Sequence, residues 1–267
     1  MNNAVYKIDI PANEPILGYL KGSKEEKALA AELQRQSETV IEIPLIIDGK
    51  EVKTGKIGEF RMPCDHKHVL ARYHMAGEKE VKMAIDAACK AQQTWCNVPW
   101  QDRAAVALKI ARLIADKYRA VVNAATMLGQ GKNIFQAEID SACETIDFLR
   151  FNASFMSQIY AEQPVSDATQ MNRLEYRALE GFVFAVSPFN FTAIASNLSM
   201  SPVIMGNAVV WKPATTAILS NYYLMQIYKE AGLPDGVINF LPGQGSLIGN
   251  VVRSEERRVG KECRSRW

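Results

Sequence analysis

The sequence predicts an α/β fold, in which a layer of long helices and a hairpin precede a partial Rossmann-type parallel sheet. From position 181 onward, short apolar runs alternate with helical segments, which is the pattern of a doubly wound parallel sheet. Between positions 79 and 161, apolar residues recur at helical spacing in three long segments. With 267 residues and a hydrophobic content of 48%, the chain can fill a sizeable core.

The N-terminal part of the chain predicts helices around one hairpin. Residues 1–40 are expected to form a helical lead, with a single helix over the charged, Ala- and Leu-rich stretch 24–36. An apolar run at 43–47 and a second strand from Glu51 flank Asp48-Gly49, a strong turn signal for a β-hairpin. The three segments of the helical layer are expected at 79–95, 101–128 and 134–161.

The C-terminal part predicts a parallel sheet that is incomplete. A doubly wound nucleotide-binding sheet normally has about five or six strands, and only three are evident here. We therefore expect residues 41–252 to be one incomplete nucleotide-binding domain. Its strands are expected at 182–186, 208–211 and 237–241, separated by helices at 192–205 and 218–231, with a further helix from Ser246.

The last fifteen residues, 253–267, differ from the rest of the chain. They are rich in Arg and Glu and show no helical apolar stripe. They also resemble the translation of a widely used sequencing adapter joined in frame to a coding sequence. We predict that this segment is a non-native tail. The alternative is a solvated basic tail.

Composition excludes several classes of function. Lys and Arg total 31 against 29 Asp and Glu, and a net charge of +2 does not favour a nucleic-acid partner. No apolar run approaches the roughly 20 residues that span a bilayer, and the N-terminus lacks the layout of a signal peptide. The five cysteines are scattered without a CxxC pair, as expected of reduced thiols. These features favour a bacterial cytoplasmic protein or an already processed chain.

The loop after the first predicted strand is the strongest candidate site. Ligands of open α/β sheets bind beyond the carboxyl ends of the strands, which is where Ser187-Pro188-Phe189-Asn190 falls. The side-chain NH2 of Asn190 can donate a hydrogen bond to an oxygen that becomes negative in a tetrahedral intermediate. The alternative is that Asn190 only caps the helix that begins at Thr192.

Two further groups lie at the same predicted edge. Lys212 ends the second strand, where its ammonium can bond ribose hydroxyls, while Pro213 fixes the turn after it. The alternative for Lys212 is a solvent-facing lysine at a strand end. Gly245 and Gly249 follow the third strand and open a helix, as in a phosphate-binding turn, although their spacing departs from GxGxxG.

Longer stretches of the sequence resemble one known family. The chain is similar to the pyrroline-5-carboxylate dehydrogenase branch of the aldehyde dehydrogenase superfamily over residues 10–252. SPFN at 187–190 and WKP at 211–213 occur across the superfamily, whereas GQGK at 129–132 together with QAEID at 136–140 is typical of the branch. The runs at 13–17, 147–152, 181–190 and 230–236 match the same branch.

This resemblance implies an aldehyde dehydrogenase-like fold, NAD as cofactor and a small-molecule substrate, L-glutamate γ-semialdehyde, which is oxidised to glutamate in proline catabolism. It implies that Asn190 stabilises the oxyanion, and that Ser187 and Lys212 contact NAD. The backbone at Pro188 and Phe189 would line the nicotinamide side. Such enzymes are homo-oligomers, located in the bacterial cytoplasm or, in a eukaryote, in the mitochondrial matrix.

The same resemblance implies positions for two more residues, and the sequence departs from the family pattern at one. Glu138 and Phe191 match positions that flank the substrate in the branch, although a helix-surface Glu and a core Phe are the alternatives. Some NAD-dependent relatives carry an acidic residue three positions after the lysine, and Thr215 stands there instead, which leaves room for NADP. The nucleophilic Cys and the general-base Glu of the family lie beyond this sequence, so we expect the fragment itself to be inactive.

A function of another class is also open. Cys64, His66 and His68, with His74 nearby, could hold zinc or copper, which would make the chain a metal-binding module. A Cys with HxH lacks a partner pair at zinc-finger spacing, so we expect no metal site. A non-catalytic binding role is the remaining alternative.

Overall fold

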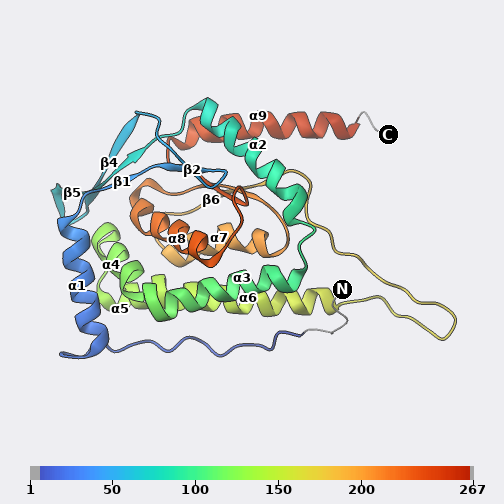
Figure 1. Cartoon of the computed structure of the whole chain (residues 1–267), viewed down its shortest axis with the longest axis horizontal. Coiled ribbons are helices and arrows are strands. Elements are labelled where there is room, and N and C mark those ends of the chain that lie inside the picture. The colour runs from blue at the N-terminus through green and yellow to red at the C-terminus, as the bar shows by residue number, and fades with distance from the viewer. Residues whose placement is uncertain (1–6, 265–267) are drawn as a thin grey trace.

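The computed structural model describes residues 7–264, which form a central sheet with helices packed on both of its faces (Figure 1). The sheet has the strand order β3-β2-β8-β7-β6. Its parallel strands are β6 (Val183–Val186), β7 (Val209–Lys212) and β8 (Ile238–Phe240), which confirms the three strands expected from the sequence.

The predicted hairpin is present, and it extends this sheet. Strand β2 (Leu45–Ile47) pairs antiparallel with β3 (Lys50–Val52) across the Asp48-Gly49 turn. Strand β2 also pairs antiparallel with β8, through Ile46 and Phe240. The sheet therefore has five strands, because an element distant in sequence supplies two of them.

Alternation along the strands buries both faces of the sheet. In β7, Val209 and Trp211 pack on one side, whereas Val210 packs on the other. Helices α7 and α8 lie against the first side, with α3, α4 and α6 packed behind them, and α2 and α9 cover the second side (Figure 1). The helices are α2 (Glu78–Trp95), α3 (Trp100–Leu113), α4 (Arg119–Gln130), α5 (Ile134–Ala137), α6 (Glu144–Ala161), α7 (Thr192–Ile204), α8 (Ile218–Ala231) and α9 (Gly245–Arg264), with the short 3₁₀ turn η3 (Thr215–Ala217) before α8.

Two of the predicted long helices contain a π-helical turn. The turn η1 (Ile114–Tyr118) joins α3 to α4, and η2 (Glu138–Cys143) joins α5 to α6. Each π turn adds a residue to one turn of the helix, so the faces before and after it do not share one period. Turns of this kind often occur at functional sites, and η2 contains two acidic residues considered below.

A second sheet was not predicted. It contains β1 (Ile41–Ile43), β4 (Ile57–Met62) and β5 (Asp65–His74), in the order β1-β5-β4. The apolar run at 43–47, expected as one strand, is divided at Pro44 between the two sheets.

The expected helical lead is only partly helical. Helix α1 (Lys24–Glu38) is present, and the Ser23 hydroxyl caps it by accepting a hydrogen bond from the Glu26 amide at 3.2 Å. Residues 7–22 instead run as an extended segment, here called the strap, along the outside of the helical layer (Figure 1). Residues 1–6 of the predicted lead lie outside the described residues.

The helix that was expected from Ser246 is present as α9, which continues into the predicted tail as far as Arg264 and projects beyond the body (Figure 1). Arg, Glu and Lys favour helix without needing an apolar stripe. The non-native origin of the tail stays a prediction. Residues 265–267 lie outside the described range. Among the residues described, no helix is both long and apolar enough to cross a membrane.

Candidate functional site

The carboxyl ends of β6, β7 and β8 lie side by side and bring the candidate residues together. The loop at 187–190 follows β6, Lys212 ends β7, and Gly245 opens α9 after β8. A Cβ atom placed on Gly245 would lie 4.0 Å from the Lys212 Nζ. Glycine at this position therefore leaves the space beside the ammonium open, and a side chain at Gly249 would also meet open space.

Lys212 has the properties of a ligand-binding group. The side chain is half-buried, and burial lowers its pKa. Among residues 7–254, whose side chains the structure describes, no protein group forms a hydrogen bond or ion pair with its ammonium. Removing a charge from water without giving it a partner raises the free energy of the folded protein. Hydrogen bonds from the Lys212 ammonium to an oxygen-rich ligand would offset that rise.

The other residues predicted to bind the cofactor differ in how far their side chains are exposed to solvent. Ser187 is buried, and its hydroxyl accepts a hydrogen bond from the Trp211 indole at 3.0 Å, so its side chain is already engaged. Pro213 is buried and shapes the turn. Pro188 is half-buried, and Phe189 is 69% exposed. A ligand contact at positions 187–189 would therefore involve the backbone or the Phe189 ring.

Asn190 does not cap helix α7. The N-cap position is Phe191, and no side chain forms a capping hydrogen bond there. The Asn190 side chain is exposed and, in the part of the chain that the structure describes, has no hydrogen-bond partner. The capping alternative is thus wrong, and the Asn190 amide is free to donate to a ligand. Asn190 also lines an open hollow of about 470 Å³ together with Pro63, Gly129, Gln130, Lys132, Phe189 and Thr216.

Lys132 holds the backbone of this loop. Its ammonium donates to the Asn190 carbonyl oxygen and pairs with the Asp140 carboxylate. It also lies 4.2 Å from the centroid of the Phe191 ring. Phe191 is half-buried against this cation, so it is not a fully buried core residue, and its position beside the substrate stays a prediction.

The GQGK motif has a physical explanation in this arrangement. A Cβ atom on Gly129 would lie 2.8 Å from the Phe60 ring of β4, so only glycine allows this approach. Gly131 has a φ of 68° and ends α4 in the left-handed conformation, which turns the chain toward Lys132. Gln130 donates to the Thr192 hydroxyl at 2.9 Å, at the start of α7.

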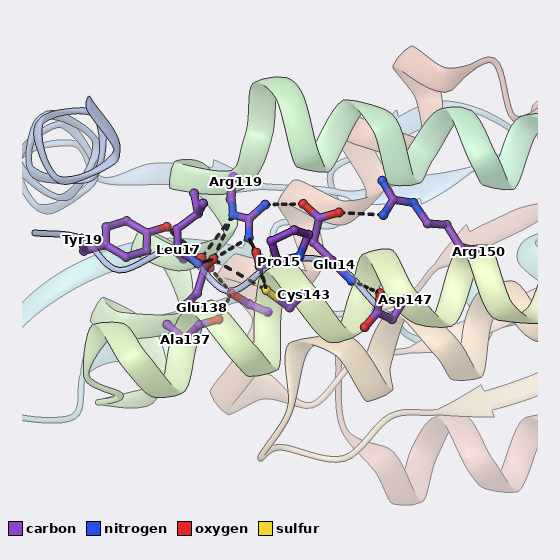
Figure 2. Close-up of polar contacts among 12 residues, drawn as sticks. Glu14, Pro15, Leu17, Tyr19, Arg119, Ala137, Glu138, Cys143, Asp147 and Arg150 are labelled. Atoms are coloured by element: carbon purple, nitrogen blue, oxygen red, sulfur yellow. Dashed lines mark hydrogen bonds and ion pairs between the residues drawn. The ribbon is translucent and has the colours of Figure 1, made fainter. Parts of the chain in front are cut away.

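The QAEID motif supplies buried anions on the η2 turn. Glu138 is fully buried, and its carboxylate pairs with Arg119 (Figure 2). It also accepts hydrogen bonds from the Tyr19 hydroxyl at 2.8 Å and the Asn123 amide at 2.8 Å. The helix-surface alternative for Glu138 is therefore wrong. Its carboxylate is occupied by protein groups, which leaves no exposed surface on it for a substrate.

The strap covers this buried cluster (Figure 2). Its backbone contributes the Leu17 amide to Glu138, at 2.9 Å, and the Pro15 carbonyl to Arg119, at 2.6 Å. Its Glu14 carboxylate pairs with Arg119 and with Arg150, each at 2.6 Å. The N-terminal segment is thereby fixed to α4, η2 and α6 through charged groups rather than through an apolar face.

The environment sets the protonation of the cluster. Burial raises the pKa of Glu138, but the Arg119 guanidinium and the Leu17 and Tyr19 donors outweigh it and leave the pKa below its usual value. Burial, with the neighbouring Glu138 charge, raises the pKa of the Cys143 thiol to about 12. Cys143 is therefore a protonated, unreactive thiol rather than a nucleophile.

The possible metal ligands are not clustered. Cys64 is exposed between β4 and β5, and His68 contacts the Ser37 carbonyl at 2.7 Å. His74 is buried, with Nε2 2.8 Å from Glu42 and Nδ1 accepting from the Thr54 amide at 3.1 Å. Among the described residues, no three His, Cys, Asp or Glu side chains lie close enough to hold a metal ion.

Sequence comparison matches most of the chain to one family. The model of the aldehyde dehydrogenase family matches residues 52–259. This match runs past Val252 into the segment predicted to be non-native, so the boundary at Val252 stays a prediction. A probable delta-1-pyrroline-5-carboxylate dehydrogenase of Schizosaccharomyces pombe is 50% identical over 96% of this chain and 47% of its own length. The mitochondrial delta-1-pyrroline-5-carboxylate dehydrogenase of Homo sapiens is 43% identical, over 93% of this chain and 44% of its own.

Solved structures give the same match. The Delta-pyrroline-5-carboxylate dehydrogenase from Mycobacterium tuberculosis bound with NAD aligns with a TM-score of 0.92 and 42% identity, over 94% of this chain and 47% of that one. A 1-pyrroline-5-carboxylate dehydrogenase from Thermus with bound NAD aligns with a TM-score of 0.84 and 32% identity, over 92% and 48%. The chain thus spans about half the length of the relatives that it matches.

Proposed function

This chain belongs to the aldehyde dehydrogenase family, and we propose that it forms the cofactor-binding part of an NAD-dependent enzyme that oxidises L-glutamate γ-semialdehyde to L-glutamate in proline catabolism. One observation carries the proposal: the half-buried Lys212 ammonium has no partner among the described side chains and opens onto the glycine-lined start of α9. Relatives named for this activity, and structures of such enzymes with NAD, support the choice of substrate and cofactor.

In this proposal each group at the carboxyl ends of β6, β7 and β8 has one role. NAD would supply the hydride acceptor. Lys212 would donate hydrogen bonds to its ribose hydroxyls, and Gly245 and Gly249 would let its phosphates approach the start of α9. The Pro188 and Phe189 backbone would line its nicotinamide, and Ser187, which is buried and accepts from the Trp211 indole, would act through its backbone. Pro213 keeps the turn after Lys212 in place.

The Asn190 amide donates to the oxygen of the substrate aldehyde, where negative charge develops when a thiolate attacks. None of the cysteine side chains that the structure describes lines the hollow beside Asn190, so the described residues supply an oxyanion donor and a cofactor site but no nucleophile. We expect the purified chain to bind NAD without turning over substrate. Thr215 in place of an acidic residue allows some NADP to bind.

The proposal includes three segments and a cellular setting. Residues 1–40 form an N-terminal lead, 41–252 an incomplete NAD-binding domain, and 253–267 a non-native tail. The complete enzyme is a homo-oligomer, located in the mitochondrial matrix of a eukaryote or in a bacterial cytoplasm. Several eukaryotic relatives carry the word mitochondrial in their names, which supports the first location.

Replacing Lys212 with methionine tests the cofactor site. Hydrogen bonds to a charged group contribute about 1.5–3 kcal/mol, so we expect Lys212→Met to raise the Kd for NAD roughly 10- to 150-fold. Isothermal titration calorimetry of the purified chain measures this change. Lys229→Met, at an exposed position on α8, is the matched control and should bind NAD as the wild type does. Equal affinity of Lys212→Met and wild type would refute the site.

A further inference from the structure

We propose that Lys132 is a positioning residue, which holds the Asn190 carbonyl so that the Asn190 side chain points toward the reacting oxygen. This inference rests on the proposed role of Asn190 as oxyanion donor. Three contacts carry it: Lys132 donates to the Asn190 carbonyl, pairs with Asp140 and packs on the Phe191 ring.

The ammonium is held in a fixed place. The Lys132 side chain is only 18% exposed and that of Asp140 3%, so the ion pair is shielded from water. Burial raises the pKa of Asp140, and the backbone amides of Thr192 and Ala193 at the start of α7, together with Lys132, partly offset this rise by favouring the carboxylate. A cation fixed by a buried anion on one side can orient a carbonyl dipole on its other side.

The elements that carry the pair are themselves rigid. Gly131 adopts the left-handed conformation immediately before Lys132. Asn133 and Gln136 then form a reciprocal capping box, with hydrogen bonds of 2.9 and 3.1 Å, which fixes the short helix α5. The η2 turn follows α5 directly and presents Asp140 to Lys132, while Glu138 of the same turn is held by Arg119.

Two carboxylates of the η2 turn therefore attach it to two different segments of the chain. Glu138 attaches η2 to the strap, and Asp140 attaches η2, through Lys132, to the loop beside the proposed oxyanion site. No other side chain among the described residues hydrogen-bonds the Asn190 backbone carbonyl. Without Lys132, that carbonyl would lose its charged donor and the peptide unit between Asn190 and Phe191 would be free to rotate.

Selective isotope labelling tests this proposal on the whole chain. The sequence contains two Asn–Phe dipeptides, Asn190-Phe191 and Asn239-Phe240. Labelling Asn with ¹³C at the carbonyl and Phe with ¹⁵N gives one NMR cross-peak for each of them. The second dipeptide lies in the buried strand β8 and serves as an internal control.

We expect Lys132→Met to move the Asn190-Phe191 cross-peak and to leave the Asn239-Phe240 cross-peak in place. Lys117→Met removes an exposed lysine that pairs with Glu230, and it should move neither peak. Asp140→Asn keeps the shape of the side chain but removes the charge that holds Lys132, so it should move the first peak in the same direction. If Lys132→Met does not fold, Asp140→Asn tests the role of Lys132 in its place.

An unmoved Asn190-Phe191 peak in a folded Lys132 or Asp140 variant would overturn the proposal. Equal movement of both peaks would do the same, because it would indicate a general loosening of the fold. The readout does not depend on NAD. Failure of the wild-type chain to bind NAD in calorimetry would count against the proposed function and leave the result for Lys132 unaffected.

Discussion

Replacing Arg119 with methionine is expected to lower the free energy of unfolding by about 3–5 kcal/mol, the typical cost of breaking a buried ion pair from one side. Arg119 pairs with Glu138, which has no exposed surface, and with Glu14 of the strap. Methionine fills a similar volume but leaves the Glu138 charge buried without its main partner. Urea unfolding of the purified chain, followed by circular dichroism, measures the difference.

Lys117→Met gives the matched control for this prediction. Lys117 is two residues away in the chain and pairs with Glu230, but both side chains are exposed at 57% and 38%. An exposed ion pair contributes about 0–1 kcal/mol, so this variant should be nearly as stable as the wild type. Similar losses in the two variants would contradict the view that burial makes the Arg119 cluster important for stability.

The same cluster predicts how stability depends on acid pH. The folded pKa of Glu138 lies below its usual value of 4.5, because Arg119 and the Leu17 and Tyr19 donors favour the carboxylate. The stability that Glu138 contributes is therefore fully present above its unfolded pKa and is lost as the pH falls through the folded value. Burial raises the pKa of Asp140, which has the opposite effect, so the wild type alone does not isolate Glu138.

Comparison with Glu138→Gln separates the two carboxyl groups. The variant should be less stable than the wild type at neutral pH, and the gap should narrow as the pH falls below about 4.5. Thermal unfolding at a series of pH values gives both curves. A gap that stays constant across the acid range would mean that the Glu138 charge is not what holds the cluster.

Replacing Asn190 with alanine in a full-length enzyme that carries this segment is expected to lower kcat by about 10²- to 10³-fold, the typical effect of removing one oxyanion donor. The reason is that its side-chain amide is exposed at the strand edge and has no protein partner among the described residues. KM should change little, because the donor acts mainly when the oxygen carries negative charge. Steady-state kinetics with L-glutamate γ-semialdehyde and NAD measure both constants.

Stability measurements on Asn190→Ala test whether partial unfolding, and not the loss of the donor, lowers kcat. Since the Asn190 side chain is exposed and forms no hydrogen bond with any described residue, Asn190→Ala should change the free energy of unfolding by no more than about 0.5 kcal/mol. Asn172→Ala, at an exposed position on the loop after α6, should leave kcat unchanged. A wild-type kcat in the Asn190→Ala enzyme would show that Asn190 does not stabilise the oxyanion.

The sequence predicted the local elements well because each depends on neighbouring residues. Apolar periodicity placed α1, the long helices and the three parallel strands, and the Asp48-Gly49 signal placed the hairpin. The motifs at 187–190 and 211–213 located the strand edge, because ligands of an open parallel sheet bind beyond the carboxyl ends of its strands. Family resemblance supplied the roles of Asn190 and Lys212, which spacing alone left open.

The sequence prediction failed where distant segments meet. The second sheet and the pairing of β2 with β8 depend on partners far apart in the chain, and no local pattern specifies such pairing. Glu138 matched a position that flanks the substrate in the branch, and only the fold shows that η2 and the strap bury its carboxylate against Arg119. The GQGK and QAEID motifs contained Lys132 and Asp140, yet only the fold brings them to the Asn190 loop.

By itself, then, the sequence determined which segments become helices and strands, and it identified the edge of the sheet where the candidate residues lie. Only the tertiary structure decided which polar side chains remain free to act. Lys212 and Asn190 have no partner among the side chains that the structure describes, whereas Ser187 accepts a hydrogen bond from Trp211 and Glu138 pairs with Arg119. The physical reason is that a hydrogen bond or ion pair requires two groups within about 3 Å, and chain folding rather than residue type sets that distance.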